Sequence, residues 1–470
     1  MTMIGLKRML YLAPVAMGMA LGGCNTLTTP DFNNPGLGEI ENNPNRANIA
    51  AQATGLLIGA RNGIAGRAGY VSELGILGRE SYNFDAADPR FVTELLRDPL
   101  NGGNGAFGGN HWVARYINIR NANGLLASVD AAEAEGGVFT SEELAALRGF
   151  AKTMQALDLL LVINTRDDLG APVDVAGDPT GDPAPIVSKT EVFNRIVTLL
   201  DDANGELSNG GSSFPFPLSS GFSGFDTPAT FQQFNRALKT RVDVYMGNFA
   251  QALTDITGSF IDDNPSIDVS GLKVGVYHSY SQGSGDVSNG IFDPSNLLIL
   301  AHPSIVTDAQ PGDERLDRKV IQVPTVNDQA GEGVSSDRAF TIYTSLSAPV
   351  PIIRNEELIL LRAEANIGMG GAAADAALAD INLIRQQSGG LPAITLANWQ
   401  VMTGSQKLDE LLYNKRYSLL FEGHRWIDMR RYGRLSQLPL DVPSFVVHDK
   451  FPFPQRECDA RTPPPSAGCS

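Results

Sequence analysis

Pairs of long segments with one hydrophobic face recur along this chain of 470 residues, and they constrain its fold more than any other feature. Residues 46–66, 112–129 and 141–165 repeat apolar side chains at helical spacing. Residues 188–191 read Ser-Lys-Thr-Glu, a capping box that predicts the start of another helix. The sequence therefore predicts a mostly α-helical protein.

Glycines separate two of the predicted helical pairs. Gly247 lies between two helices within residues 227–256, and Gly370-Gly371 separates NEELILLRAEANIGM from AAADAALADINLIRQQS. Glycine supplies the positive φ that helix C-termini often need. Two antiparallel helices joined in this way form the unit of a tetratricopeptide-type array, here irregular and interrupted.

Two regions lack this periodicity. Residues 271–350 are rich in glycine and serine, with short β-like runs such as LKVGVYHSY, KVIQVPTV and FTIYTSL, which predicts loops and a small sheet. Residues 67–110 are also loop-rich. Long loops on a rigid scaffold are common places for binding sites.

The N-terminus predicts export and lipid attachment. Lys7 and Arg8 precede an apolar run that is too short to span a bilayer, as in a secretory signal over residues 1–23. Small residues directly before Cys24 resemble a lipobox, so Cys24 is the predicted lipidation site. Residues 24–45 are a predicted tether, and Asn25 in place of aspartate favours the outer membrane over inner-membrane retention.

Composition narrows the possible functions. The net charge of −16 disfavours nucleic acid, whose phosphates favour basic surfaces. Cys458 and Cys469 predict one disulfide in a proline-rich tail. No HExxH, G-x-S-x-G, P-loop or dinucleotide motif occurs in a suitable setting, and the five histidines are scattered. The sequence thus predicts no cofactor, no metal site and no catalytic residues, although two carboxylates brought together in space would suffice for a glycosidase.

Five segments together resemble the SusD/RagB family. PIIRNEELILLRAEANIGMG, ADINLIRQQSGG and LFEGHRWIDMRRYG resemble its late helical pair and C-terminal motif. LRGFAKTMQALDLLLVINTRDDLGAPV and TFQQFNRALKTRVDVYMGNFAQAL are similar to its long helix and central hairpin. The departures Asn414 and Ser418, where the family usually has acidic residues, put individual ion pairs in doubt.

The resemblance implies one helical domain over residues 46–470 with a loop-rich, ligand-facing half. It also implies a cell-surface lipoprotein, anchored in the outer membrane, that captures a glycan or another small nutrient such as a peptide. Such a protein delivers its ligand to a SusC-like TonB-dependent transporter and is not an enzyme. A lipid-anchored hydrolase and a helical-repeat interaction scaffold remain as alternatives.

The most polar stretch of the C-terminal region, residues 411–435, is interpreted as scaffold. Glu422 and Asp428 are six residues apart with Gly423 between them, a spacing that does not place two carboxylates together on a helix. His424 and Asp428 are four apart and could face each other, but no third metal ligand accompanies them. These groups, with Arg425 and Arg430, are expected to pair with one another or to cap helices around Trp426.

Sugar binding requires exposed aromatic faces beside polar groups. The candidates lie in the loop-rich regions, although ordinary packing is the alternative explanation for each of them: Tyr82, Asn83, Asp85, Phe107, Trp112, Tyr277 and Tyr280.

Overall fold

A computed structural model describes residues 44–469 except 104, 178–180, 285 and 296. The predicted signal peptide, Cys24 and the predicted tether as far as residue 43 lie outside the described residues. Within the described part of the chain, none of the helices combines the length and apolar character needed to span a bilayer.

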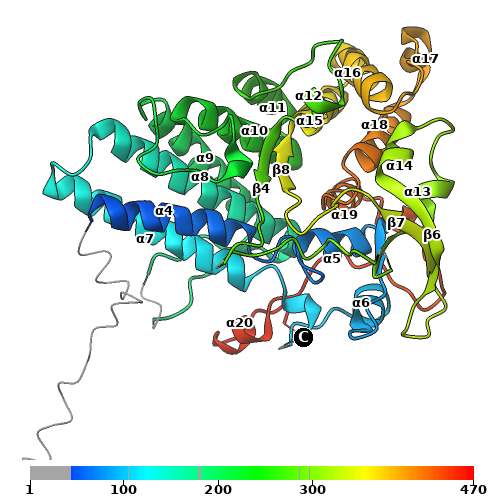
Figure 1. Cartoon of the computed structure of the whole chain (residues 1–470), viewed down its shortest axis with the longest axis horizontal. Helices are drawn as coiled ribbons and strands as arrows, with labels where there is room; N and C mark the ends of the chain where they lie inside the picture. Colours follow the sequence, from blue (N-terminus) through cyan, green and yellow to red (C-terminus); the bar gives the residue numbers. More distant parts are fainter. Residues whose placement is uncertain (1–43, 104, 178–180, 285, 296, 470) are drawn as a thin grey trace, which may run out of the picture.

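The long helices pack as successive antiparallel neighbours (Figure 1). α8 packs against α7 and α9, and α10 packs against α9 and α11. These elements are α4 (Arg46–Arg61), α7 (Val113–Glu135), α8 (Ser141–Arg166), α9 (Lys189–Leu207), α10 (Pro228–Met246) and α11 (Phe249–Asp255). The predicted mostly helical fold class is confirmed.

Side-chain caps start these helices where the sequence indicates. Thr140 caps α8 and Ser188 caps α9, each in a full capping box. Gly247 ends α10 in the left-handed conformation, with φ of 77°. This glycine allows the chain to reverse into α11, as a tetratricopeptide-like hairpin requires.

A second helical group follows in the C-terminal part. α15 (Asn355–Met369) and α16 (Gly371–Leu383) form the predicted pair, and α18 (Gly404–Ser418) packs against α15. α19 (Arg425–Arg431) begins after Gly423, whose φ is 86°. The shorter helices are α5 (Tyr70–Leu77), α6 (Arg90–Val92), α12 (Val269–Leu272), α13 (Ser304–Thr307), α14 (Glu314–Lys319), α17 (Leu396–Val401) and α20 (Gln455–Asp459).

Three small antiparallel sheets complete the described fold. The largest has the strand order β1-β5-β7-β6, and the other two pair β2 with β3 and β4 with β8. The strands are β1 (Ser81–Asn83), β2 (Ala171–Pro172), β3 (Ile186–Val187), β4 (Gly275–His278), β5 (Ile299–Ala301), β6 (Val320–Asn327), β7 (Ser335–Phe340) and β8 (Val350–Arg354). The small sheet predicted for residues 271–350 is therefore present, but the run FTIYTSL leaves the sheet after Phe340.

The loop-rich interpretation of residues 67–110 is wrong for one segment. α5 (Tyr70–Leu77) is a helix in which every residue is buried. A helix that is buried on all sides has no solvent-facing polar stripe and therefore no helical alternation to detect. It lies in a hydrophobic core together with the large sheet and the C-terminal motif, beside the core of the long helices.

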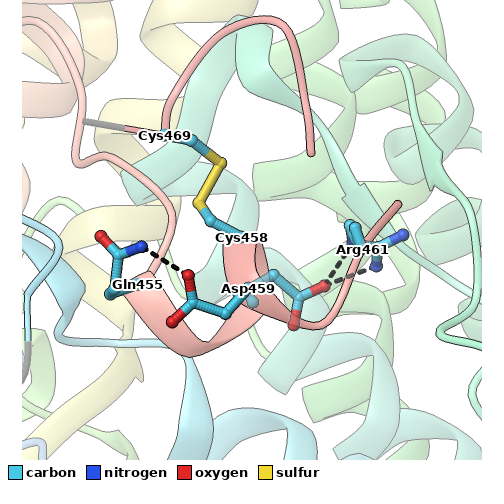
Figure 2. Close-up of a disulfide and its surroundings, with 6 residues drawn as sticks. Gln455, Cys458, Asp459, Arg461 and Cys469 are labelled. Carbon is cyan, nitrogen blue, oxygen red and sulfur yellow. Dashed lines mark hydrogen bonds and ion pairs between the residues drawn. A yellow bond between two sulfur atoms is a disulfide. The ribbon is translucent and has the colours of Figure 1, made fainter. Parts of the chain in front are cut away.

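The tail of the chain is closed by a disulfide (Figure 2). Cys458 at the end of α20 is bonded to Cys469, with Cα atoms 5.8 Å apart. Arg461 donates to Glu457 at 2.9 Å and to the carbonyl of Ala184 at 2.7 Å. The disulfide and these hydrogen bonds hold the proline-rich tail against the helical part.

Candidate functional site

The polar side chains of residues 411–435 bind partners on other elements as well as one another. Arg354 at the end of β8 donates to Glu422, with its Nη2 atom 2.8 Å from Oε1. Asp428 accepts from Lys415 of α18 at 2.9 Å. Glu422 therefore pairs with an arginine outside the stretch, whereas Asp428 pairs within it, and both contacts support the expected structural role.

Trp426 is at the centre of these contacts, as expected. Its indole is fully buried and donates to the carbonyl of His448 at 2.7 Å. The Arg430 guanidinium lies 4.5 Å from the indole centroid and donates to the carbonyl of Asn164. Arg425 donates to the carbonyl of Gly78 at 3.0 Å. These hydrogen bonds to backbone carbonyls connect α19 to segments that are distant in sequence, so the guanidinium groups of Arg425 and Arg430 contribute to the scaffold.

His424 and Asp428 do not face each other as an acid and base would. Asp428 donates its backbone N–H to the carbonyl of His424, an ordinary helical bond. Burial holds the pKa of His424 well below its usual value. Glu422 and His424 line a cavity of about 40 Å³, which is too small for a sugar ring.

The departures Asn414 and Ser418 have a partner in common. Arg315 is fully buried and donates to Asn414 Oδ1 and to Ser418 Oγ, both at 3.0 Å. The charge of Arg315 is balanced by Asp313, which it contacts through two hydrogen bonds. Asp313 at the start of α14 supplies the negative charge that balances Arg315. Neutral side chains therefore suffice at positions 414 and 418.

Most of the predicted ligand residues are buried. Tyr82 is 1% exposed and stacks on Phe84, and Phe107 is 5% exposed and stacks on Phe91. Asn83 and Tyr280 are also buried. Asp85 is partly exposed and is paired with Arg67 at 2.6 Å. These side chains offer no open ring face to a ligand in this structure.

Trp112 borders a pocket of about 520 Å³ but has little accessible ring surface. It is 4% exposed, with the Arg166 guanidinium 5.3 Å from its ring centroid. Tyr116 and Phe453 contact the same ring at centroid distances of 4.7 and 5.4 Å. Packing therefore accounts for Trp112.

Tyr277 lies in a groove of about 470 Å³. One wall comes from α4, the second from residues 217–222 and the third from β4 and the residues that follow it. Buried side chains form its base: Leu57, Ala60, Met154, Phe222, His278 and Ile352. This volume is within the usual range for small-molecule sites.

The groove is lined by Tyr277 and by serines with unused hydroxyl groups. Tyr277 is partly exposed, and its own hydroxyl donates to the carbonyl of Lys273. Within the described residues, no protein group bonds to the hydroxyls of Ser219, Ser220 or Ser279. A ligand with its own hydroxyl groups can therefore bond to these serines without displacing a protein contact.

A close backbone approach shapes the second wall. A Cβ atom added to Gly221 would lie 1.9 Å from the carbonyl oxygen of Tyr277. Only glycine allows the turn Ser220–Phe222 to lie directly on β4 at this point. The turn thereby brings Ser219 and Ser220 close to the backbone of β4.

The electrostatics of the groove are simple. Burial raises the pKa of Tyr277 to about 12, and burial with nearby Arg115 and Arg61 lowers the pKa of His278 to about 3. Both side chains are therefore neutral at physiological pH. Arg61 and Asp286 form an ion pair at the rim. Among the described residues, no group of three or more His, Cys, Asp or Glu side chains is arranged to hold a metal.

Sequence reasoning named Tyr277 as a candidate and named none of the other residues that line this groove. Arg61, Ser219, Ser220 and Asp286 come from segments that are far apart in the chain, and none belongs to a motif. Only the glycine- and serine-rich composition of residues 271–350 pointed toward this region.

Comparison with known proteins identifies the fold. The sequence profile described as the SusD family matches residues 334–459. No curated protein matches the chain in sequence.

Solved structures match nearly the whole chain. A laminarin-binding SusD-like protein is 17% identical, with a TM-score of 0.60, covering 88% of this chain and 98% of its own. A SusD-like carbohydrate-binding protein from Bacteroides fragilis is 15% identical, with a TM-score of 0.66 and coverage of 90% and 99%. A SusD superfamily protein from Bacteroides vulgatus is 14% identical, with a TM-score of 0.65 and the same coverage. These likenesses confirm the resemblance to the SusD/RagB family: the chain has the SusD-like fold, and residues 334–459 carry the family's sequence pattern.

Proposed function

We propose that this protein binds carbohydrate in the groove at Tyr277 and does not cleave it. The observation that carries the proposal is a groove lined by the partly exposed Tyr277 and by three serines whose hydroxyls have no protein partner among the described residues. Sugars present apolar ring faces and many hydroxyl groups, which match an aromatic face and hydroxyl partners. Relatives of the same fold that are described as binding laminarin or carbohydrate support this assignment.

Replacing Tyr277 with alanine is expected to weaken glycan binding at least tenfold, because an aromatic anchor in a pocket contributes about 2 kcal/mol or more. Tyr277→Phe is the matched control: it keeps the ring and loses only a hydroxyl that is bonded to the protein. Titration calorimetry against a panel of oligosaccharides measures both variants. Equal affinity of the alanine variant and the wild type would remove Tyr277 from the site.

The same incubations distinguish binding from hydrolysis. Chromatography of the oligosaccharides after long contact with the protein is expected to recover them intact. Released products that disappear on changing a pair of carboxylates would favour the hydrolase alternative. Binding of peptides but not of glycans would favour a peptide-binding protein.

The proposed cellular role is delivery to a SusC-like TonB-dependent transporter at the outer membrane. Residues 1–23 serve as the signal, Cys24 carries the lipid and residues 24–45 form the tether. The SusD-like fold and the apolar run before Cys24 support this role. Several acyl chains on one cysteine give stable membrane attachment.

A Cys24→Ser variant is expected to lose its fatty acid and to be released from the membrane or to remain unprocessed. Metabolic labelling with a fatty acid, followed by fractionation of the membranes, measures both effects. The Cys458→Ser/Cys469→Ser variant is the control, because it removes the disulfide and leaves the predicted lipidation site intact. Normal cleavage and membrane retention of the Cys24→Ser variant would contradict the lipid anchor.

A further inference from the structure

Charge in the Tyr277 groove is confined to one ion pair. Of the residues that line it, Arg61 and Asp286 are the two that carry charge at neutral pH. The pair is partly shielded, with side-chain exposures of 11% and 26%. The remaining polar atoms of the lining come from hydroxyls, backbone groups and the neutral His278.

Both members of the pair already have protein partners, although the Nε–H of Arg61 has none among the described residues. Arg61 contacts Asp286 Oδ1 and donates to the carbonyl of Ser279 at 2.5 Å. The other oxygen of Asp286 accepts from Ser281 at 2.5 Å, and Val287 N–H donates to Oδ1 at 2.8 Å. Hydrogen bonds from Ser281 and Val287, together with Arg61, hold the pKa of Asp286 below its usual value, so it stays charged at neutral pH.

We infer that the groove selects uncharged glycans over acidic ones, and that Asp286 sets this selectivity by neutralising Arg61. The inference rests on the proposed carbohydrate-binding function. An acidic sugar would place its carboxylate in a partly dehydrated groove whose single guanidinium already has a counter-ion. Removing a carboxylate from water without a free cation is unfavourable. A neutral sugar avoids this cost and bonds to the serines.

The first test compares matched ligands on the wild-type protein. Four-sugar gluco-, manno- and galacto-oligosaccharides are titrated beside the same molecules with one C6 hydroxyl oxidised to a carboxylate. For each oligosaccharide that binds, the neutral form is expected to bind at least tenfold more tightly than its oxidised counterpart. Its affinity should not change between low and high salt, because no charge of the ligand is involved.

The second test changes the charge of the groove while keeping its shape. Asp286→Asn keeps an oxygen for Arg61 and frees the charge of the guanidinium. We expect the affinity of this variant for the oxidised oligosaccharides, relative to that for the neutral ones, to be at least tenfold higher than in the wild type. The matched Arg61→Gln/Asp286→Asn variant has no net charge at the rim and should lose this gain.

Different results would overturn the charge selectivity and the proposed carbohydrate binding. Equal wild-type affinity for the neutral and oxidised members of a pair would overturn the charge selectivity and leave carbohydrate binding intact. So would an Asp286→Asn variant that binds neutral sugar normally and gains nothing for the oxidised one. Failure of every glycan to bind the wild type would overturn the proposed function, and the selectivity with it.

Discussion

Replacing Glu364 with alanine is expected to lower the free energy of unfolding by about 3–5 kcal/mol, the usual cost of breaking a buried ion pair. Glu364 on α15 is almost fully buried and accepts from Lys415 at 2.8 Å, from Tyr432 at 2.7 Å and from Arg431. Without it, two buried cations depend on Asp428 alone for a counter-charge. Urea denaturation measures the loss.

The control for this prediction is a charge pair at the surface. Asp130 on α7 pairs with Arg148 and is 69% exposed, so Asp130→Ala should cost at most about 1 kcal/mol. Below the melting temperature, Glu364→Ala should bind glycans with wild-type affinity, because the network lies away from the Tyr277 groove. Unchanged stability with lost binding would show that the C-terminal motif is functional and not scaffold.

Replacing Glu80 with glutamine is expected to stabilise the protein at pH 8 by up to roughly 3 kcal/mol. Glu80 is 1% exposed, and neither carboxylate oxygen has a hydrogen-bond donor in bonding geometry among the described residues. Burial raises its pKa to about 7, although nearby Arg425 lowers it in part. The folded protein therefore holds a proton that the unfolded chain releases near pH 4.5.

The sign of this effect follows from the two pKa values. Because the folded pKa is the higher one, the contribution to stability is complete below about pH 4.5 and is lost as the pH rises to about 7. Between pH 4.5 and 8, the free energy of unfolding of the wild type, measured by denaturation, should fall relative to that of Glu80→Gln. Exposed Glu135→Gln is the control. If the free energies of unfolding of the wild type and Glu80→Gln change in parallel with pH, the pKa of Glu80 is not raised.

The sequence predicts the long helices because their determinants are local. Capping boxes at Thr140 and Ser188 and the turn at Gly247 each require only a few adjacent residues. α5 escapes prediction since it is short and buried on every side. Tertiary packing, not local periodicity, places it in the core.

The candidate site is harder to predict because it is assembled from distant segments. Tyr277 stands out as an aromatic residue in a loop-rich region, but Tyr82, Phe107 and Trp112 share that feature and are buried. Aromatic side chains serve both cores and sugar platforms, and only the packing of neighbours distinguishes the two uses. Arg61 lies more than two hundred residues from its partner Asp286, so no local pattern connects them.

A structure of the protein with a bound oligosaccharide would show directly whether the Tyr277 groove holds a neutral sugar. Crystals grown with the tightest-binding oligosaccharide of the panel should show a sugar ring against the face of Tyr277. Hydroxyls of that sugar should lie within hydrogen-bonding distance of Ser219, Ser220 or Ser279. A ligand bound elsewhere, such as in the pocket beside Trp112, with the Tyr277 groove empty, would contradict the account.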